Sequence, residues 1–418
     1  MTISEEISAF VTELSFKDIA KETISVTKNL IFDALCCGLV GSSAESTRPI
    51  YDLVKSQGGL ESSIWFSHSR ATASFAAFSN AAAMHAYDLD DQYAYGALHP
   101  GSVVIPTALA IAEYQKSTGK ELLTAIVAGY AIMIGIGEAF FTGPAEPKVR
   151  LSKSIQPNPV CGVFACAAIA GKLLGQDSTT ITNSLGIAGS FAFGNRQFMA
   201  GEAETKALQQ GKTTMSGILS ALLASRGLTG PPAIFEGEDG IFRIYFGNFS
   251  KGPVFPPLDS KSVADVSIKR YPMIYSAQAP IDGILILKQK HNLRHEDVRE
   301  VRVNVLPRYV PVGASLPEMT EYRPISKILA HMDMRYGLAV ALMEGKLGLT
   351  HFSDKWLTNR KAWQLSNKIR IVADPLLEQY GRKVAYAPAR VSVTTCSDRS
   401  FEILVETAAG HPKKSLNL

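Results

Sequence analysis

Residues 85–101, which read HAYDLDDQYAYGALHPG, hold two histidines and three aspartates. His85 and Asp88 are three residues apart, so they would share a face if a helix continues through them, and Asp91 would join that face. His99 follows a glycine-containing loop and precedes a Pro-Gly pair, where the chain can turn sharply. This concentration of imidazoles and carboxylates suits three roles: a metal site, an acid/base site or a solvated turn.

The surrounding sequence argues against the metal site. No second cluster of acidic residues or histidines stands nearby to complete a coordination shell. The five cysteines form no C-x-x-C pair, so we expect reduced, buried thiols and no zinc site. Imidazole exchanges protons near neutral pH, which favours acid/base chemistry or substrate contact. An exposed acidic helix end is the remaining alternative.

Composition narrows the class of partner. The chain has 418 residues, 46% of them hydrophobic, and a formal charge of +4, which allows two domains with sizeable cores. It shows no dense Lys/Arg tract, so we expect a small anionic substrate and no nucleic acid. The N-terminus lacks a signal-peptide pattern, and we interpret the apolar run at 121–143 as a buried core helix. The protein is therefore expected to be cytoplasmic, without membrane contact.

The pattern of apolar residues changes along the chain. Helical patterns with small residues at three- and four-residue spacing fill the first part, at 24–40, 103–119, 122–140, 162–175 and 216–230. A Pro/Gly-rich bridge follows at 245–261. Beyond it, alternating segments predict half-buried antiparallel strands, and two helical segments lie among them: strands at 298–307, 367–374, 389–396 and 400–406, helices near 278–290 and 326–345.

These patterns predict a mainly α fold with two domains. Residues 1–262 should form a large all-helical domain, and residues 263–418 a smaller α+β lid domain whose C-terminal end is free to return to the first.

Five separated segments, in the same order, resemble the MmgE/PrpD family, which includes 2-methylcitrate dehydratase, cis-aconitate decarboxylase and iminodisuccinate epimerase. The first is the opening stretch with the helix after it, HAYDLDDQ…LHPGSVVIPTALAIAE. The other four are GVFACAAIAGKLLGQD, KALQQGKTTMSGILSALLASRGLTGPPAIFEGEDG, KRYPMIYSAQAPIDG and MRYGLAVALMEGKL. The resemblance implies this same fold, a homodimer, and no metal or organic cofactor.

The resemblance also implies a set of catalytic residues, namely Asp88, His99, Lys206, Lys269 and Tyr336. Two lysines can bind substrate carboxylates and stabilise negative charge on a neighbouring carbon. His99 can carry a proton, Asp88 can orient its ring, and Tyr336 can act as a second donor.

Other residues of these motifs are expected to bind substrate: His85, Gln92, Gln156, Lys212 and Gln278. Of these, His85 could simply end its helix and bond a carboxylate. Gln156 and Gln278 stand where relatives carry histidine, and Gln92 where threonine is common. Glutamine hydrogen-bonds but does not exchange protons at neutral pH. The chain is therefore a divergent member of the family.

Three functions remain open. The first is a cofactor-independent lyase, a dehydratase or decarboxylase of a citrate-like polycarboxylate that acts by proton abstraction next to a carboxylate. The second is an isomerase or epimerase, which needs no acid for a leaving group. The third is a non-catalytic homologue that binds carboxylates, against which the retained charged residues argue.

Overall fold

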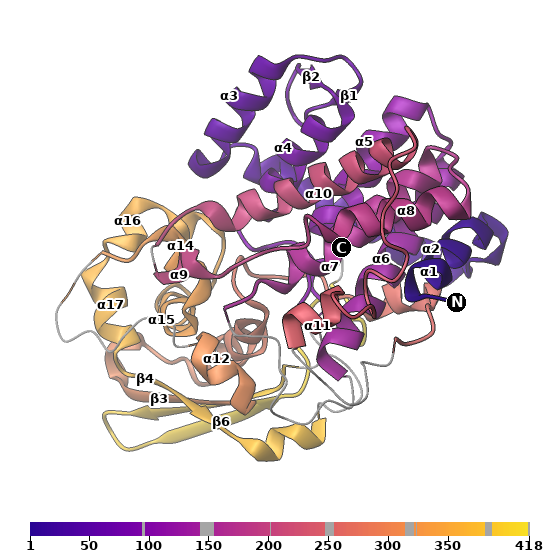
Figure 1. Ribbon diagram of the computed structural model, residues 1–418. Helices are drawn as coiled ribbons and strands as arrows, with labels where there is room; N and C mark the ends of the chain where they lie inside the picture. The colour runs from indigo at the N-terminus through magenta and orange to yellow at the C-terminus, as the bar shows by residue number, and fades with distance from the viewer. Residues whose placement is uncertain are drawn as a thin grey trace. The chain divides into compact units, whose positions relative to one another are not determined.

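Helices rich in alanine, glycine and serine dominate the first 266 residues, as the computed structural model shows (Figure 1). The chain divides into two compact units. Unit 1 comprises Met1–Ala86, Asp90–Ala200 and Glu204–Val266, and unit 2 comprises Tyr87–Leu89, Gly201–Ala203 and Ser267–Leu418. The residues that the structure describes are 1–93, 97–142, 154–200, 202–246, 255–313, 322, 324–380 and 387–416. Residues 247–254 of the predicted Pro/Gly-rich bridge lie outside them.

Unit 1 is built from helices. They are α1 (Ile3–Glu13), α2 (Lys21–Gly41), α3 (Arg48–Gln57), α4 (Ala73–His85), α5 (Gly101–Gln115), α6 (Gly119–Thr142), α7 (Pro157–Leu173), α8 (Ser178–Gly189), α9 (Gln197–Ala200), α10 (Thr205–Ala224) and α11 (Ile241–Phe246). The helices expected at 24–40, 103–119, 122–140 and 162–175 lie within a few residues of α2, α5, α6 and α7, whereas the helix expected at 216–230 begins at Thr205 and ends at Ala224. The prediction of an all-helical domain was wrong in one detail. Strands β1 (Ser62–Ser63) and β2 (Arg70–Ala71) form a short antiparallel pair.

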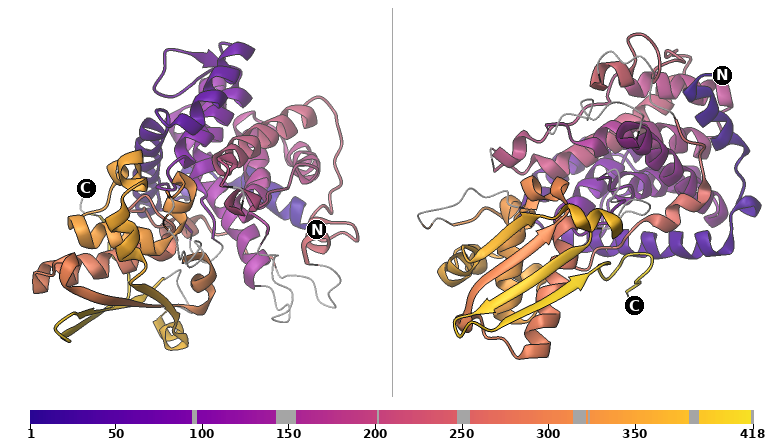
Figure 2. Two further views of the ribbon diagram at one scale, coloured as in Figure 1. Left: turned by 90° about the vertical axis from the view of Figure 1, so that its left-hand side faces the viewer. Right: turned by 90° about the horizontal axis from the view of Figure 1, so that it is seen from below.

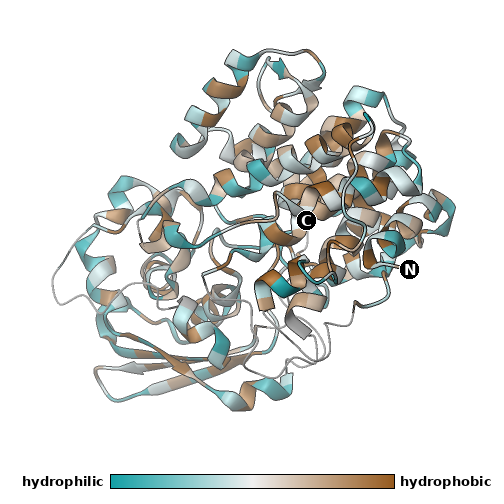
Figure 3. Ribbon diagram, in the orientation of Figure 1, coloured by the Kyte–Doolittle hydropathy of each residue, from teal (hydrophilic) through white to brown (hydrophobic). Residues whose placement is uncertain are grey.

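The core of unit 1 lies among α4, α5, α6, α7 and α10, and Figure 3 shows hydrophobic residues concentrated on α5, α6 and α7. A Cβ on Gly211 of α10 would come within 2.6 Å of Phe78 of α4, so only glycine permits this approach. The close packing sets the start of α10 beside the end of α4.

Among the residues that the structure describes, two helices are long and apolar enough to cross a membrane by length and composition. The window in α6 is 83% buried within the protein, which confirms that this run is a core helix. The window in α2 is 33% buried.

Unit 2 combines a four-stranded sheet with helices, which confirms the mainly α fold with a smaller α+β part. Its elements are α12 (Gln278–His291), β3 (Val298–Val305), α13 (Val310–Gly313), α14 (Lys327–Met332), α15 (Met334–Glu344), α16 (Asp354–Leu357), α17 (Arg360–Ser366), β4 (Ile369–Ala373), β5 (Ala389–Thr395) and β6 (Ser400–Val405). The helix expected at 326–345 is broken at Asp333, whose side chain caps α15 by accepting from the Arg335 N–H.

The strand order is β4-β3-β5-β6, and α12 packs on β5 and β6 (Figures 1 and 2). Alternate residues of β5 are buried, as the period-two pattern predicted. The expectation of antiparallel pairing fails for β3 and β4, which are parallel. A long helical connection joins these two strands, as parallel neighbours require.

The expectation of buried thiols is wrong for two of the five cysteines. Cys36 and Cys396 are exposed, whereas Cys37, Cys161 and Cys166 are buried, and none of these five cysteines forms a disulfide. Burial raises the pKa of the Cys166 thiol to about 12, which makes it unreactive at neutral pH.

Candidate active site

The histidine-aspartate stretch does not continue as a helix. Helix α4 ends at His85, and Asp88 takes a left-handed conformation with φ of 52°, which aspartate tolerates better than most residues. The expectation that His85, Asp88 and Asp91 share a helical face is therefore wrong. The solvated turn is also wrong, since Asp88, Asp90 and Asp91 are exposed by only 4%, 0% and 1%.

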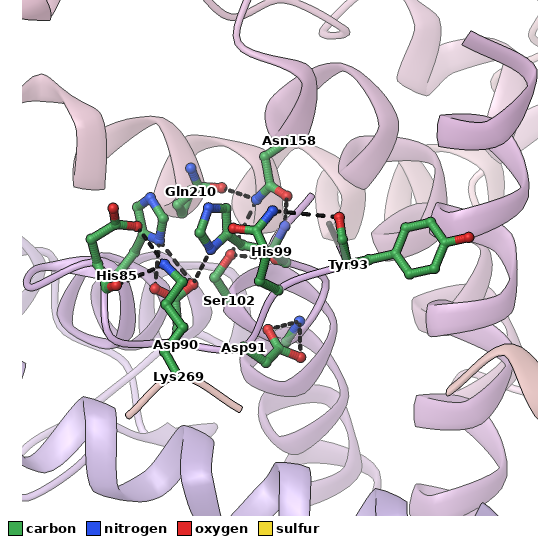
Figure 4. Close-up of polar contacts among 12 residues, drawn as sticks. His85, Asp90, Asp91, Tyr93, His99, Ser102, Asn158, Gln210 and Lys269 are labelled. Atoms are coloured by element: carbon green, nitrogen blue, oxygen red, sulfur yellow. Dashed lines mark hydrogen bonds and ion pairs between the residues drawn. The ribbon is translucent and has the colours of Figure 1, made fainter. Parts of the chain in front are cut away.

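Asp90 joins the two histidines in unit 1 (Figure 4). Its Oδ2 lies 2.9 Å from Nδ1 of His85 and 3.2 Å from Nδ1 of His99. The two rings are in edge contact, with centroids 4.8 Å apart. One buried carboxylate thus holds both imidazoles.

A buried lysine extends this group. Nζ of Lys206, at the start of α10, lies 2.9 Å from Nε2 of His85. An ammonium can only donate, so Nε2 is the acceptor, and the ring proton sits on Nδ1 facing Asp90. Hydrogen bonds therefore connect Lys206 to His85 and His85 to Asp90. The expectation that His85 ends a helix and bonds a carboxylate is confirmed.

Electrostatics keep the central carboxylate ionised. Burial opposes ionisation of Asp90, but the two imidazole rings beside it, with the hydrogen bond from His85, outweigh burial, so the pKa of Asp90 stays well below its usual range. Nδ1 of His99 lies at ion-pair distance from Asp90, so a ring proton on Nδ1 would leave Nε2 as the basic nitrogen of His99. A neutral imidazole can accept a proton, and an imidazolium can deliver one.

Backbone and amide contacts set the position of His99. Its N–H donates to Oδ1 of Asn158 at 2.7 Å, and its carbonyl accepts from the Ser102 hydroxyl at 2.7 Å. Asn158 lies in the first turn of α7 and donates in turn to Gln210 of α10 (Figure 4). Two core helices therefore support this histidine.

Asp91 has a separate role. It accepts from the Gly101 N–H at 3.0 Å and from the Tyr130 hydroxyl at 2.7 Å. Gly101 opens α5, so the carboxylate satisfies a free N–H at the positive end of that helix. Burial, followed by the Asp91 charge, raises the pKa of Tyr130 well above its usual range.

The spacing in unit 1 would admit a metal ion. Ligand atoms of His85, Asp90 and His99 lie within 4.8 Å of one another. Both ring nitrogens of His85 already contact protein groups, however, and the ammonium of Lys206 would repel a cation there. The donors thus fit a hydrogen-bonded network better than a coordination shell, and metal independence stays a prediction.

Lys269 and Asp88 form a buried ion pair within unit 2. Nζ of Lys269 donates to the backbone carbonyl of Asp88 at 2.7 Å and to its Oδ1 at 2.9 Å. Asp88 therefore pairs with Lys269, and Asp90, rather than Asp88, bridges the two histidines. The predicted single helical face does not describe this arrangement.

Two other predicted residues of unit 2 make contacts to backbone groups. The Gln278 amide accepts from the N–H groups of Arg270 and Tyr271 and donates to the carbonyls of Tyr271 and Met273. It therefore holds the loop that follows Lys269. The Tyr336 hydroxyl donates to the His351 carbonyl at 2.5 Å, and burial raises the pKa of this tyrosine.

The remaining predicted binding residues belong to unit 1. Nζ of Lys212 donates to the carbonyls of Phe191 and Phe193, both at 2.8 Å. Gln92 is buried and donates weakly to a neighbouring carbonyl at 3.4 Å. Gln156 precedes α7, where its Oε1 accepts from Arg196 at 3.3 Å.

Sequence reasoning missed Asp90, Asn158 and Gln210 as members of this site. Asp90 lies in the histidine-aspartate stretch, but a continuous helix there would place Asp88 and Asp91, and not Asp90, on the face of His85. Asn158 lies between two prolines at a helix start, and this was its only local signal.

Two protein-family models match the chain, one in each part of it. The model of the MmgE/PrpD N-terminal domain matches residues 5–253, and that of the MmgE/PrpD C-terminal domain matches residues 271–417. The chain belongs to the MmgE/PrpD family. The resemblance seen in the five motifs is thereby confirmed.

Relatives within the MmgE/PrpD family are similar along most of the chain. A cis-aconitate decarboxylase-like protein of Aspergillus oryzae is 27% identical, covering 88% of this chain and 79% of its own. Human cis-aconitate decarboxylase is 26% identical, covering 100% and 85%. The cis-aconitate decarboxylase of Aspergillus terreus is 25% identical, covering 93% and 82%.

Proposed function

We propose that the protein is a lyase that acts on a polycarboxylate by building negative charge on a carbon beside a carboxylate. The buried Lys206–His85–Asp90–His99 network carries this proposal. It connects the Lys206 cation, through His85, and the His99 imidazole to one carboxylate, and a cation and an imidazole can stabilise and protonate a carbanion. The names of the relatives favour decarboxylation among lyase reactions.

In a decarboxylation, the bond between the substrate carbon and the leaving carboxylate breaks. Carbon dioxide departs, the electron pair stays on the substrate, and a proton from the protein completes the product. The Lys206 ammonium would offset the charge that develops. His99, as imidazolium, would deliver the proton from Nε2 and regain one from water.

Dehydration fits the described side chains less well, because it also needs an acid for the leaving hydroxyl. Gln156 and Gln278 cannot supply a proton at neutral pH, and the Tyr336 hydroxyl is used by a backbone carbonyl. The same two glutamines favour a second candidate, an isomerase or epimerase. That reaction needs only the removal and return of one proton.

Incubation of the protein with cis-aconitate, citrate and 2-methylcitrate in deuterated water tests these alternatives by NMR. A decarboxylase releases carbon dioxide and leaves one deuterium on the product. An isomerase exchanges the proton without loss of carbon, and a non-catalytic homologue does neither. We expect decarboxylation that survives exhaustive chelation; loss of activity in EDTA, restored by a divalent cation, would overturn the acid/base interpretation.

A further inference from the structure

Arg196 is a partly buried cation with little to neutralise it. It lies just before α9, and its Nε donates to Oε1 of Gln156 at 3.3 Å. Among the residues that the structure describes, no carboxylate forms an ion pair with it. A guanidinium has five N–H donors, and one amide oxygen uses only one of them.

Other partly buried cations of unit 1 are better satisfied. Lys172 donates to the carbonyls of Val11 and Leu14, and Lys212 donates to those of Phe191 and Phe193. Burial lowers the pKa of Arg196, as it does for both lysines. An arginine buried without a countercharge costs free energy, which a bound anion would recover.

The backbone around Arg196 is held firmly in place. Its own N–H donates to the Ser154 carbonyl at 2.8 Å, and the Gln156 N–H donates to the Gly194 carbonyl. The neighbouring Asn195 exchanges two hydrogen bonds with the side chain of Gln209 on α10. The guanidinium is therefore presented from a fixed segment.

This segment adjoins the support of the histidine network. Gln156 directly precedes α7, and two residues later Asn158 accepts from the His99 N–H. Asn158 also donates to Gln210, the neighbour of Gln209 on α10. Arg196 and His99 are thus held by the same first turn of α7 and the same stretch of α10.

We propose that Arg196 and Gln156 form a subsite for one carboxylate of the substrate, distinct from the carboxylate beside the reacting carbon. The inference rests on the proposed function. A guanidinium binds a carboxylate through two parallel hydrogen bonds, and the Gln156 amide can add a third. The amide at position 156 leaves the arginine charged and available, whereas a carboxylate there would occupy it.

Titration calorimetry with citrate, cis-aconitate and succinate tests the subsite, together with thermal unfolding. Arg196→Met should weaken binding of the two tricarboxylates roughly 10- to 100-fold, as for loss of a charge-assisted hydrogen bond. Arg196→Lys should recover part of that loss. Arg226→Met, which removes an exposed arginine of unit 1, is the matched control and should bind as the wild type does.

Gln156→Glu separates binding from folding. The new carboxylate would pair with Arg196, so the thermal midpoint should hold or rise while tricarboxylate binding falls at least tenfold. A purely structural arginine would lower the midpoint of Arg196→Met and leave binding unchanged in both variants. Wild-type affinity in Arg196→Met and Gln156→Glu overturns the subsite alone; a wild-type protein that binds none of the three acids overturns the proposed function with it.

Discussion

Lys206 and Lys269 are both buried, but different partners hold them. Lys206 faces an imidazole nitrogen, whereas Lys269 contacts the carboxylate and carbonyl of Asp88. If both bind substrate carboxylates, replacing either by methionine should lower turnover by roughly two to three orders of magnitude. Steady-state kinetics on the substrate found by NMR measures this, with Lys28→Met on the exposed face of α2 as control. Near-normal kinetics in both variants would contradict their assignment.

His99 is the proposed proton carrier, so its replacement should remove proton transfer while leaving ligand binding largely intact. His99→Gln should abolish deuterium incorporation from solvent and lower turnover roughly a hundredfold or more. Ligand affinity should stay within about tenfold. Asp90→Asn should also impair turnover, because a neutral amide replaces the ionised carboxylate that lies beside both histidine rings. If His99→Gln keeps isotope exchange, the proton carrier is another residue.

At the scale of elements, the start of α5 depends on one buried carboxylate. Asp91→Asn weakens the bonds from Gly101 and Tyr130, and should lower the free energy of unfolding by about 1–3 kcal/mol. Glu121→Gln is the matched control, since Glu121 accepts from Thr118 before α6 at an exposed site. Its cost should stay below about 1 kcal/mol. Equal effects in urea denaturation would show that burial of Asp91 does not matter.

The same close packing explains why Gly101 is glycine. A Cβ at this position would lie 2.7 Å from the Tyr130 hydroxyl and 2.8 Å from the Asp91 carboxylate. Any side chain must therefore push apart the two groups that hold the start of α5.

The C-terminal segment contributes a pH-dependent term to the stability of unit 2. His411 is buried and accepts from the Lys413 N–H, and burial, aided by the Lys413 charge, lowers the pKa of its ring to about 4. Above pH 6.5 neither the folded nor the unfolded state protonates it. Between pH 6.5 and 4 only the unfolded chain binds this proton. The free energy of unfolding therefore decreases as the pH is lowered from 6.5 to 4.

His411→Asn should remove this dependence while keeping an acceptor for Lys413. The difference in unfolding free energy between wild type and variant should be constant above pH 6.5 and shift in favour of the variant down to pH 4. His68→Asn, at an exposed position, is the control. Parallel pH profiles for wild type and His411→Asn would contradict the assignment.

At the scale of the whole molecule, we expect a homodimer. Helix α2 is apolar, and its Phe32 and Leu39 side chains are 58% and 53% exposed. Covering such residues against a second copy removes apolar surface from water. Light scattering after gel filtration should therefore give twice the chain mass of 45.1 kDa. A monomer at micromolar concentration, or binding to lipid vesicles, would contradict this expectation.

The sequence by itself determined the features that depend on local pattern. Helical periodicity located the core helices, alternation located the four strands of the sheet, and five ordered motifs indicated the family. These signals are strong because burial on one face imposes its period on each segment independently of its partners.

Only the tertiary structure decided which groups meet. Asp90, and not Asp88, bridges the histidines because α4 ends at His85 and the chain turns at once. Lys206 reaches His85 from 121 residues away because α10 packs closely on α4. An alternating pattern is compatible with parallel and with antiparallel pairing, so it did not predict the direction of β4. The path of the connection between β3 and β4 makes the two strands parallel. Contacts between distant residues depend on where elements end and how they pack, which no local pattern encodes.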